Sequence, residues 1–442
     1  MSWKKPGMSW NSILKWIRMI DRTGKLWLRI FSLLLIVPMI CTGCKRNAAG
    51  RPEIAAEEDT EYGDFTIDNR SIEEARQELA HIMGTYKDIY QSADKGEAAN
   101  VVLADQVIHD IQKKLAESGL PVYTSVPYQN MLGGDKMDEF LNKCKKGMPG
   151  SQTIFRVNYD GGLAREEYRF DGKEMQFFSI ISSWDAALAP VISQMDEYDI
   201  SEWYYSGKGY FGYQLDVPEP PEVTEIIDGS VLIRILPLDQ EYISYSRKYV
   251  LPIGYAGNNL LSSDWDADHT EDIDYNGLSE SFYRMEYGRQ YGLSQLGENT
   301  SVNHQTESSA VNGISQKDFE RLMTRYLPVS RDQIREYAAY DHKSKTYPWE
   351  EQYCMNYSPT SFGTSLPEVV DVRENPDRTL TLTIDAVCDH VLCDDHLITS
   401  ELTVRINDKQ EIRYLANHVI SGKENIPQYQ YRINSRIPYQ TE

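Results

Sequence analysis

Three consecutive runs of alternating apolar and polar residues constrain the fold of this chain more than any other feature. They cover residues 153–159, 163–170 and 173–182, and Asp160-Gly161-Gly162 and Asp171-Gly172 separate them. Alternation with a period of two predicts strands, and Asp-Gly between two such runs predicts a tight hairpin turn. The sequence therefore predicts an antiparallel meander. Further strand-like runs lie at 209–215, 230–235 and 280–287.

Helical patterns precede this meander. Apolar residues recur at steps of three and four within residues 71–90 and again within residues 101–115. This spacing predicts two amphipathic helices, which we expect to pack as a hairpin. Ser71 followed by Glu74 has the spacing of a capping box at the start of the first helix. A shorter helix is expected over residues 136–146.

The second half of the chain begins after residues 297–313, which hold almost no large apolar side chains and predict a linker. Ser315 and Ser330 are placed to cap two short helices, over 316–327 and 331–340. Strand-like alternation then dominates as far as residue 419.

These patterns together predict an α+β fold. We expect an N-terminal α+β domain over residues 66–296, with the helical hairpin and the meander. After the linker, a smaller C-terminal α+β domain over residues 314–442 would hold two short helices, an antiparallel meander of three or four strands and a polar tail.

The first residues of the chain predict an export signal. Residues 30–40 read IFSLLLIVPMI, and seven Lys and Arg residues but only one acid precede Cys44. A helix of eleven residues is about 16 Å long, which is roughly half of a bilayer core. A cationic stretch before a short apolar run is typical of a secretory signal peptide, here residues 1–43. The alternative is an uncleaved membrane helix, which Arg29 would interrupt.

Cys41-Thr42-Gly43-Cys44 follows the apolar run and resembles the lipobox of bacterial lipoproteins, with Cys41 where that family usually has Leu. The resemblance implies that Cys44 is lipidated with a diacylglyceryl group and becomes the N-terminus. The protein would then be anchored by lipid to the extracytoplasmic face of the cell membrane. Residues 44–65 are small, polar and acidic, and we expect a flexible tether, whose 21 residues after Cys44 would reach about 25 Å.

The charge balance bears on the class of partner. From Cys44 onward the chain has 38 basic and 66 acidic residues, which gives a net charge of −28. A surface this acidic repels phosphate backbones, so we expect no nucleic-acid partner. Its simplest role is to keep the protein soluble.

Two clusters are candidates for site chemistry, and we expect no cofactor. Cys388 and Cys393, with His390 and His396 nearby, lie between predicted strands. The alternatives are a Cys388–Cys393 disulfide, a zinc site or free thiols. The redox state of Cys144 and Cys354 is left open as well.

The second cluster is Asp264, Asp266 and Asp268, whose alternating carboxylates suit a calcium ion. The EF-hand pattern fails there, because its glycine and glutamate positions hold His269 and Tyr275. A solvated acidic loop is the competing interpretation.

An aromatic run over residues 203–213 suits either stacking on sugars and peptides or burial in the sheet. The chain lacks the short sequence motifs of phosphate-binding loops, serine hydrolases, zinc proteases and dinucleotide-binding folds. We therefore name no catalytic residue.

Residues 230–290 and 314–420 resemble uncharacterised lipoproteins of Gram-positive anaerobes, through stretches such as 234–238, 249–255, 366–370 and 379–387. This resemblance brings no activity with it. Our preferred hypothesis is a non-catalytic surface module that binds an envelope protein, peptide or glycan, or supports an assembly. The alternatives are an envelope hydrolase with paired carboxylates and the substrate-binding lipoprotein of a transporter.

Overall fold

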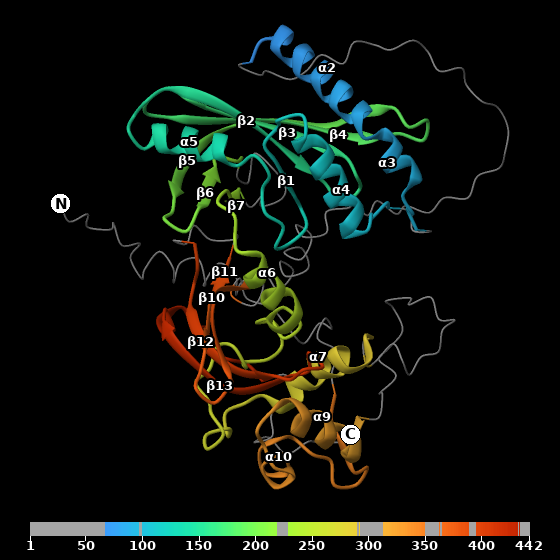
Figure 1. Ribbon diagram of the computed structural model, residues 1–442, viewed down its shortest axis with the longest axis vertical. Coiled ribbons are helices and arrows are strands. Elements are labelled where there is room, and N and C mark those ends of the chain that lie inside the picture. Colours follow the sequence, from blue (N-terminus) through green and yellow to red (C-terminus); the bar gives the residue numbers. More distant parts are fainter. Residues whose placement is uncertain are drawn as a thin grey trace, which may run out of the picture. The chain divides into compact units, whose positions relative to one another are not determined.

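The predicted meander is part of a curled sheet of seven strands whose spatial order follows their sequence order (Figure 1). Its strands are β1 Val122–Thr124, β2 Gly150–Val157, β3 Leu163–Phe170, β4 Met175–Trp184, β5 Pro190–Tyr205, β6 Tyr210–Leu215 and β7 Ser230–Arg234. β1 runs parallel to β2, and all later neighbours are antiparallel. The predicted runs at 153–159, 163–170 and 173–182 correspond to β2, β3 and β4. The computed structural model describes residues 67–96, 100–218, 229–289, 291, 313–349, 362, 365–388, 395–431 and 433.

Both predicted Asp-Gly turns are present and satisfy their own backbone groups. The Asp160 carboxylate accepts a hydrogen bond from the Gly162 amide, and Gly161 has a φ of +78°. The Asp171 carboxylate accepts from the Lys173 and Glu174 amides, and Gly172 has a φ of +109°. Positive φ angles of this kind favour glycine, so these turns set the register of the strands around them.

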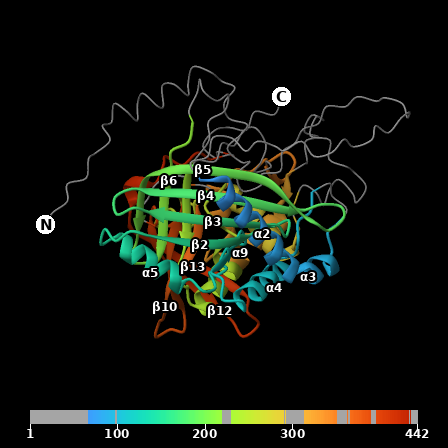
Figure 2. The ribbon, with the colours of Figure 1, turned by 90° about the horizontal axis from the view of Figure 1, so that it is seen from above.

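Helices cover the sheet. They are α2 Asn69–Thr85, α3 Lys87–Ser92, α4 Asp105–Ala116 and α5 Asp135–Cys144. Figure 2 shows α2 crossing the strands, and it contacts β3, β4 and β5. The predicted capping box was wrong, because the Asp68 side chain caps α2 by accepting hydrogen bonds from the Arg70 and Ser71 amides.

Alternation along β3 places α2 and α5 on opposite faces. Arg165 points to α2, where its guanidinium lies 2.7 Å from Glu78. Tyr168, three positions further along β3 and therefore on the other face, packs in the cluster of buried side chains that includes Phe140 and Leu141 of α5. The seven-stranded sheet is therefore packed on both faces.

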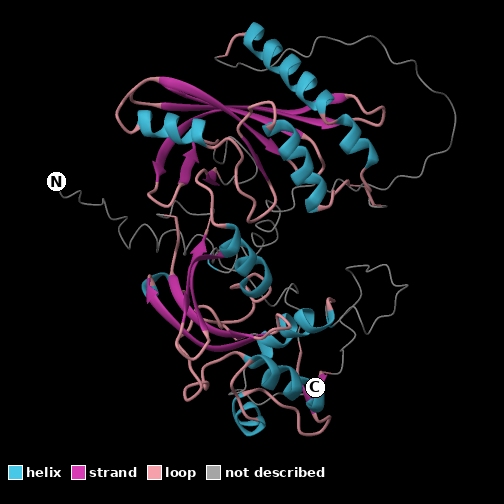
Figure 3. Ribbon diagram, viewed as in Figure 1, coloured by secondary structure: helices cyan, strands magenta, loops and turns pink. Residues whose placement is uncertain are grey.

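The rest of the described chain combines helices with a second antiparallel sheet (Figure 3). The four strands of this sheet lie in the order β10 Leu366–Glu374, β11 Leu380–Val387, β12 Thr399–Ile406 and β13 Ile412–Ser421. A two-stranded sheet joins β8 Ile314–Ser315 to β9 Thr346–Tyr347. The helices are α6 Gln240–Tyr245, the π-helical turn η2 Ser246–Val250, α7 Tyr275–Tyr287, α9 Gln316–Tyr326, α10 Arg331–Tyr337 and the 3-10 turn η4 Lys423–Asn425. A mixed fold of helices and antiparallel sheets agrees with the predicted α+β class.

The strand predicted at 280–287 was wrong, because these residues belong to helix α7. The Asp274 side chain caps this helix by accepting a hydrogen bond from the Gly277 amide. Tyr275, Leu278 and Phe282 recur at helical spacing and are all buried. That stripe was present in the sequence, but it starts upstream of the aromatic residues that suggested a strand.

The serine caps were confirmed. The Ser315 hydroxyl accepts from the Asp318 amide at the start of α9. Ser330 and Gln333 form a reciprocal capping box at the start of α10. Both helices follow their caps directly, as such short-range signals predict.

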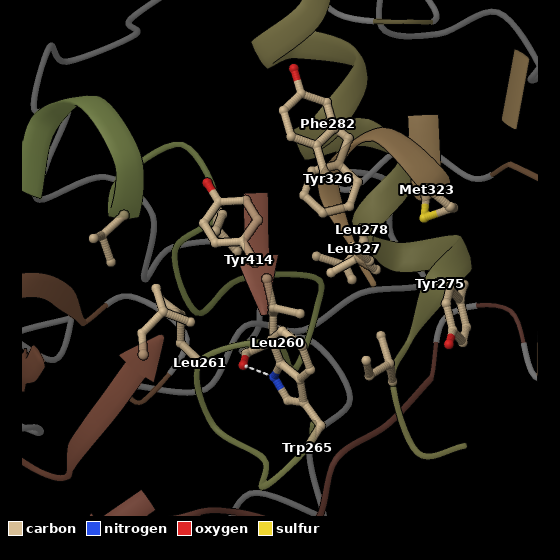
Figure 4. Packing of buried hydrophobic residues seen from close by; sticks show 14 of the residues in the cluster. Leu260, Leu261, Trp265, Tyr275, Leu278, Phe282, Met323, Tyr326, Leu327 and Tyr414 are labelled. Atoms are coloured by element: carbon tan, nitrogen blue, oxygen red, sulfur yellow. Dashed lines mark hydrogen bonds between the residues drawn. The ribbon is translucent and has the colours of Figure 1, made fainter. Parts of the chain in front are cut away.

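The second sheet packs on a core that is rich in aromatic side chains (Figure 4). The Phe282 ring lies 4.7 Å from that of Tyr326 and 6.0 Å from that of Tyr414, measured between centroids. The Trp265 indole donates a hydrogen bond of 2.8 Å to the Leu260 carbonyl. This core includes residues from 249 to 419, so it draws on both sides of the linker predicted at 297–313. Residues 297–312 themselves lie outside the described residues.

Candidate functional site

A groove of about 800 Å³ opens beside this core. Its walls come from five parts of the chain: residues 248–256 after α6, the end of α7, the end of α9, residues 365–367 at the start of β10, and residues 410–412 at the β12–β13 turn. This volume is within the range of about 300–1,000 Å³ that is typical of ligand sites. The groove is therefore a candidate binding site.

Three cations line the groove, but they differ in their partners. Arg325 is neutralised by two carboxylates, Glu286 and Glu411, each at 3.1 Å. Arg284 donates to the Pro252 carbonyl at 2.9 Å, and Lys248 donates to the Gln410 side chain at 3.2 Å. Within the described part of the chain, neither Arg284 nor Lys248 has a carboxylate partner. Glu411 is the one acid among the lining residues, so the groove is locally basic.

Three buried tyrosines belong to the groove lining. They are Tyr249, Tyr255 and Tyr326. Burial raises the pKa of Tyr249 and of Tyr255, and burial with the nearby Glu286 raises the pKa of Tyr326 to about 12. Their hydroxyls therefore stay protonated at neutral pH. Each of the three side chains is only 5% exposed, so these rings form the buried floor of the groove.

Apolar side chains complete the walls. Leu251 is 40% exposed and Leu366 is half-buried, whereas Ile253 and Ile412, which also line the groove, are buried. Leu251 therefore presents an apolar side chain to the groove.

A buried ionic cluster lies behind the 365–367 wall. Glu368 of β10 and Asp385 of β11 are direct cross-strand partners, and their side chains are 5% and 3% exposed. Arg234 of β7 is paired with Glu368, and the Lys208 ammonium is 2.5 Å from Asp385. Both cations come from the seven-stranded sheet and its turns, so the cluster joins the two large sheets.

Hydrogen bonds complete the ionic cluster. The Tyr210 hydroxyl donates to Glu368 at 2.8 Å, and the Thr399 hydroxyl donates to Asp385 at 2.7 Å. Burial raises the pKa of Glu368, and this effect outweighs the opposing attraction of Arg234. Neither carboxylate is among the residues that line the groove.

A histidine borders this cluster. The His396 ring nitrogen Nδ1 is 2.5 Å from Asp395, and the Lys208 ammonium is 3.3 Å from the same nitrogen. The hydrogen bond with Asp395 raises the pKa of His396. Burial acts to raise the pKa of Asp395. The hydrogen bonds from His396 and Ser206 and the charge of Lys208 together outweigh this effect, so the pKa of Asp395 is lowered.

The predicted calcium ligands are not brought together. Asp264 accepts from the Val419 amide and lies 2.7 Å from the Lys423 ammonium. Asp266 accepts from the Asp268 and His269 amides and so closes a turn. In the described part of the chain, no three Asp, Glu, His or Cys side chains gather as metal ligands would.

The other predicted site residues lie in different places. Cys388 is buried, while Cys393 lies outside the described residues, as do the lipidation site Cys44 and Cys354. Cys144 is a buried free thiol whose pKa burial raises to about 11. The aromatic run belongs to the core of the seven-stranded sheet, where Tyr205, Phe211 and Tyr213 are buried and Trp203 packs against them.

Sequence reasoning missed the groove and the ionic cluster. The groove cations come from segments more than thirty residues apart, so no local pattern connects them. The sequence does hold a signal for the two acids of the ionic cluster. Glu368 and Asp385 interrupt the apolar stretches LPEVV and LTIDAV. A carboxylate within a strand-like apolar stretch indicates a buried partner of opposite charge.

Together these features define a mixed fold of two large sheets, with a basic, aromatic groove beside the smaller one. The chain belongs to a family of unknown function (DUF6070), whose model matches residues 72–432. Neither the search of curated proteins nor that of solved structures found a match. Among the helices of the described residues, none has both the length and the apolar character needed to cross a membrane.

Proposed function

We propose that this protein is a lipoprotein of the cell envelope whose folded part is a non-catalytic binding module. In this proposal a diacylglyceryl group on Cys44 anchors it to the extracytoplasmic face of the cell membrane, and residues 44–65 act as the tether. The helical hairpin and meander of residues 66–296 and the smaller sheet region of 314–442 serve as scaffold. The ligand is an envelope protein, peptide or glycan that occupies the groove.

The observation that carries this proposal is the chemistry of the groove walls. Its lining has tyrosines, apolar side chains and cations, but one acid, Glu411, and no histidine or cysteine. General acid-base catalysis needs a titratable pair within reach of the reacting groups. The one carboxylate in the lining, Glu411, is already paired with Arg325, so this groove is better suited to hold a ligand than to transform it.

The alternative is an envelope hydrolase that uses paired carboxylates. One buried pair of opposed acids exists in the described residues, Glu368 and Asp385. Each of these acids is held by a cation and a hydroxyl, and neither lines the groove. We therefore favour binding. Turnover of cell-wall glycans that is abolished by Glu368→Gln or Asp385→Asn would favour the hydrolase instead.

Site-specific photo-cross-linking in native membranes tests the binding function. A photoreactive amino acid replaces Leu251 in the groove or, as a control, Val191 on β5, which is 43% exposed and lies outside the groove. We expect a defined adduct, identified by mass spectrometry, from position 251 and none from position 191. Adducts of equal yield from both positions, or none from position 251, would contradict the proposal.

A further inference from the structure

Two of the groove cations, Arg284 and Lys248, have no carboxylate partner among the described residues. They lie in a groove whose lining holds a single acid, Glu411, in a chain that has 67 acidic and 45 basic residues. Arg284 and Lys248 nevertheless hydrogen-bond only neutral groups, a backbone carbonyl and a side-chain amide, among the described residues. Arginine forms strong, charge-assisted hydrogen bonds with carboxylates. An anionic group of a ligand would complete both sites.

The walls between these cations favour a ligand that is not purely ionic. Leu251 is 40% exposed and Leu366, at the start of β10, is half-buried, so both present apolar surface in the groove. A polyanion such as polyphosphate would leave these apolar surfaces exposed to water. A chain that carries both carboxylates and apolar side chains would cover them and pair with the cations.

We infer that the groove binds an extended peptide segment of a partner protein in which acidic residues are interspersed with apolar ones. This inference rests on the proposed binding function and specifies its ligand. One carboxylate of the peptide pairs with Arg284 and another with Lys248, while its apolar side chains pack on Leu251 and Leu366. Arg325 takes no part, because Glu286 and Glu411 already neutralise it.

Fluorescence anisotropy with labelled peptide pools tests this ligand class, with the full chain in detergent. The peptides have about eight residues, roughly 26 Å when extended. One pool alternates Glu with apolar residues, a second alternates Lys with apolar residues, and a third alternates Glu with Ser. We expect only the first pool to bind, and its binding to weaken as salt is raised.

Charge-neutralising variants locate the binding. Arg284→Gln and Lys248→Gln should each weaken binding of the first pool about tenfold, since each removes a charge-assisted hydrogen bond. The matched controls are Arg373→Gln and Lys317→Gln, which remove the same charge from exposed positions outside the groove. The controls should bind like the wild type. Unchanged unfolding midpoints establish that all four variants are folded.

The outcomes separate this inference from the proposed function. Equal binding of the Lys pool or the Glu-Ser pool, or competition by polyphosphate, would overturn the peptide assignment. If position 251 cross-links to a partner and the acidic-apolar pool does not bind, the peptide inference fails and the binding function stands. If there is neither an adduct nor binding, both fail.

Discussion

Glu368 and Asp385 face each other across β10 and β11, and each is neutralised by a cation from the other large sheet. Arg234 also stacks on Tyr210, with the guanidinium carbon 4.2 Å from the ring centroid. Two opposed, buried acids would repel each other if they were ionised without these partners. The stability of this contact between the two sheets therefore depends on both cations, Arg234 and Lys208, being present together with both acids.

Arg234→Met should destabilise the protein strongly, because it leaves Glu368 buried without its cation. Breaking a buried ion pair lowers the free energy of unfolding by about 3–5 kcal/mol. Urea unfolding measures this loss. The double variant Arg234→Met, Glu368→Leu should recover most of it, and Arg373→Met, at a position where the side chain is 63% exposed, should change little. A single variant as stable as the wild type would refute the role given to the pair.

His396→Gln should reduce stability in a pH-dependent way. The pKa of His396 is raised, so the protonated ring stabilises the fold fully below pH 6.5 and this contribution is lost as the pH rises through the folded pKa. The pKa of Asp395 is lowered, so its contribution is present above pH 3.8 and is lost as the pH falls through its folded pKa.

The His396–Asp395 pair therefore stabilises the fold most between pH 3.8 and pH 6.5. We expect the variant to lose about 1 kcal/mol in free energy of unfolding at a pH near 5.5 and less at a pH near 8.5. Urea unfolding at the two pH values measures both losses. His81→Gln, on the exposed side of α2, serves as the control. A loss that is independent of pH would rule out the His396–Asp395 interaction as its cause.

The thiol of Cys144 should be unreactive in the native protein. Burial raises its pKa to about 11, so roughly one molecule in a thousand carries the reactive thiolate at pH 8. Iodoacetamide should therefore modify the peptide that contains Cys144 in urea but not in native buffer, as measured by mass spectrometry. Equal rates under both conditions would show that the side chain is accessible.

The lipid anchor gives a prediction for the N-terminus. If Cys44 is acylated, the native N-terminal peptide carries the mass of a diacylglyceryl group, and Cys44→Ala removes both this mass and the cleavage. Mass spectrometry of the membrane fraction tests this, with Cys41→Ala as the matched control that should remain acylated. An intact, unacylated N-terminus on the wild-type protein would contradict the lipoprotein proposal.

Elements set by neighbouring residues could be predicted from the sequence. The Asp160 and Asp171 turns and the Ser315 and Ser330 caps each depend on contacts within a few residues. Helix α7 was missed because its apolar stripe begins at Tyr275, before the segment that suggested a strand. Contacts between residues close in sequence were therefore enough to predict a turn or a helix wherever the first residue of its pattern was recognised.

The candidate site could not be predicted in the same way. Arg234 and Glu368 are 134 positions apart, and only the contact between two sheets brings them together. The groove depends equally on distant parts, since Lys248 and Gln410 are 162 positions apart. A single sequence contains no pattern that shows which residues so far apart will be in contact.

The shared aromatic core has a consequence for how the protein can be divided. Phe282 from before the 297–313 segment is in contact with Tyr326 and Tyr414 from after it. A fragment that starts at residue 314 would lack α7 and would expose the rings that α7 covers. Conversely, a chain cleaved once between residues 297 and 312 would keep both pieces associated, and gel filtration would report a single particle of unchanged size.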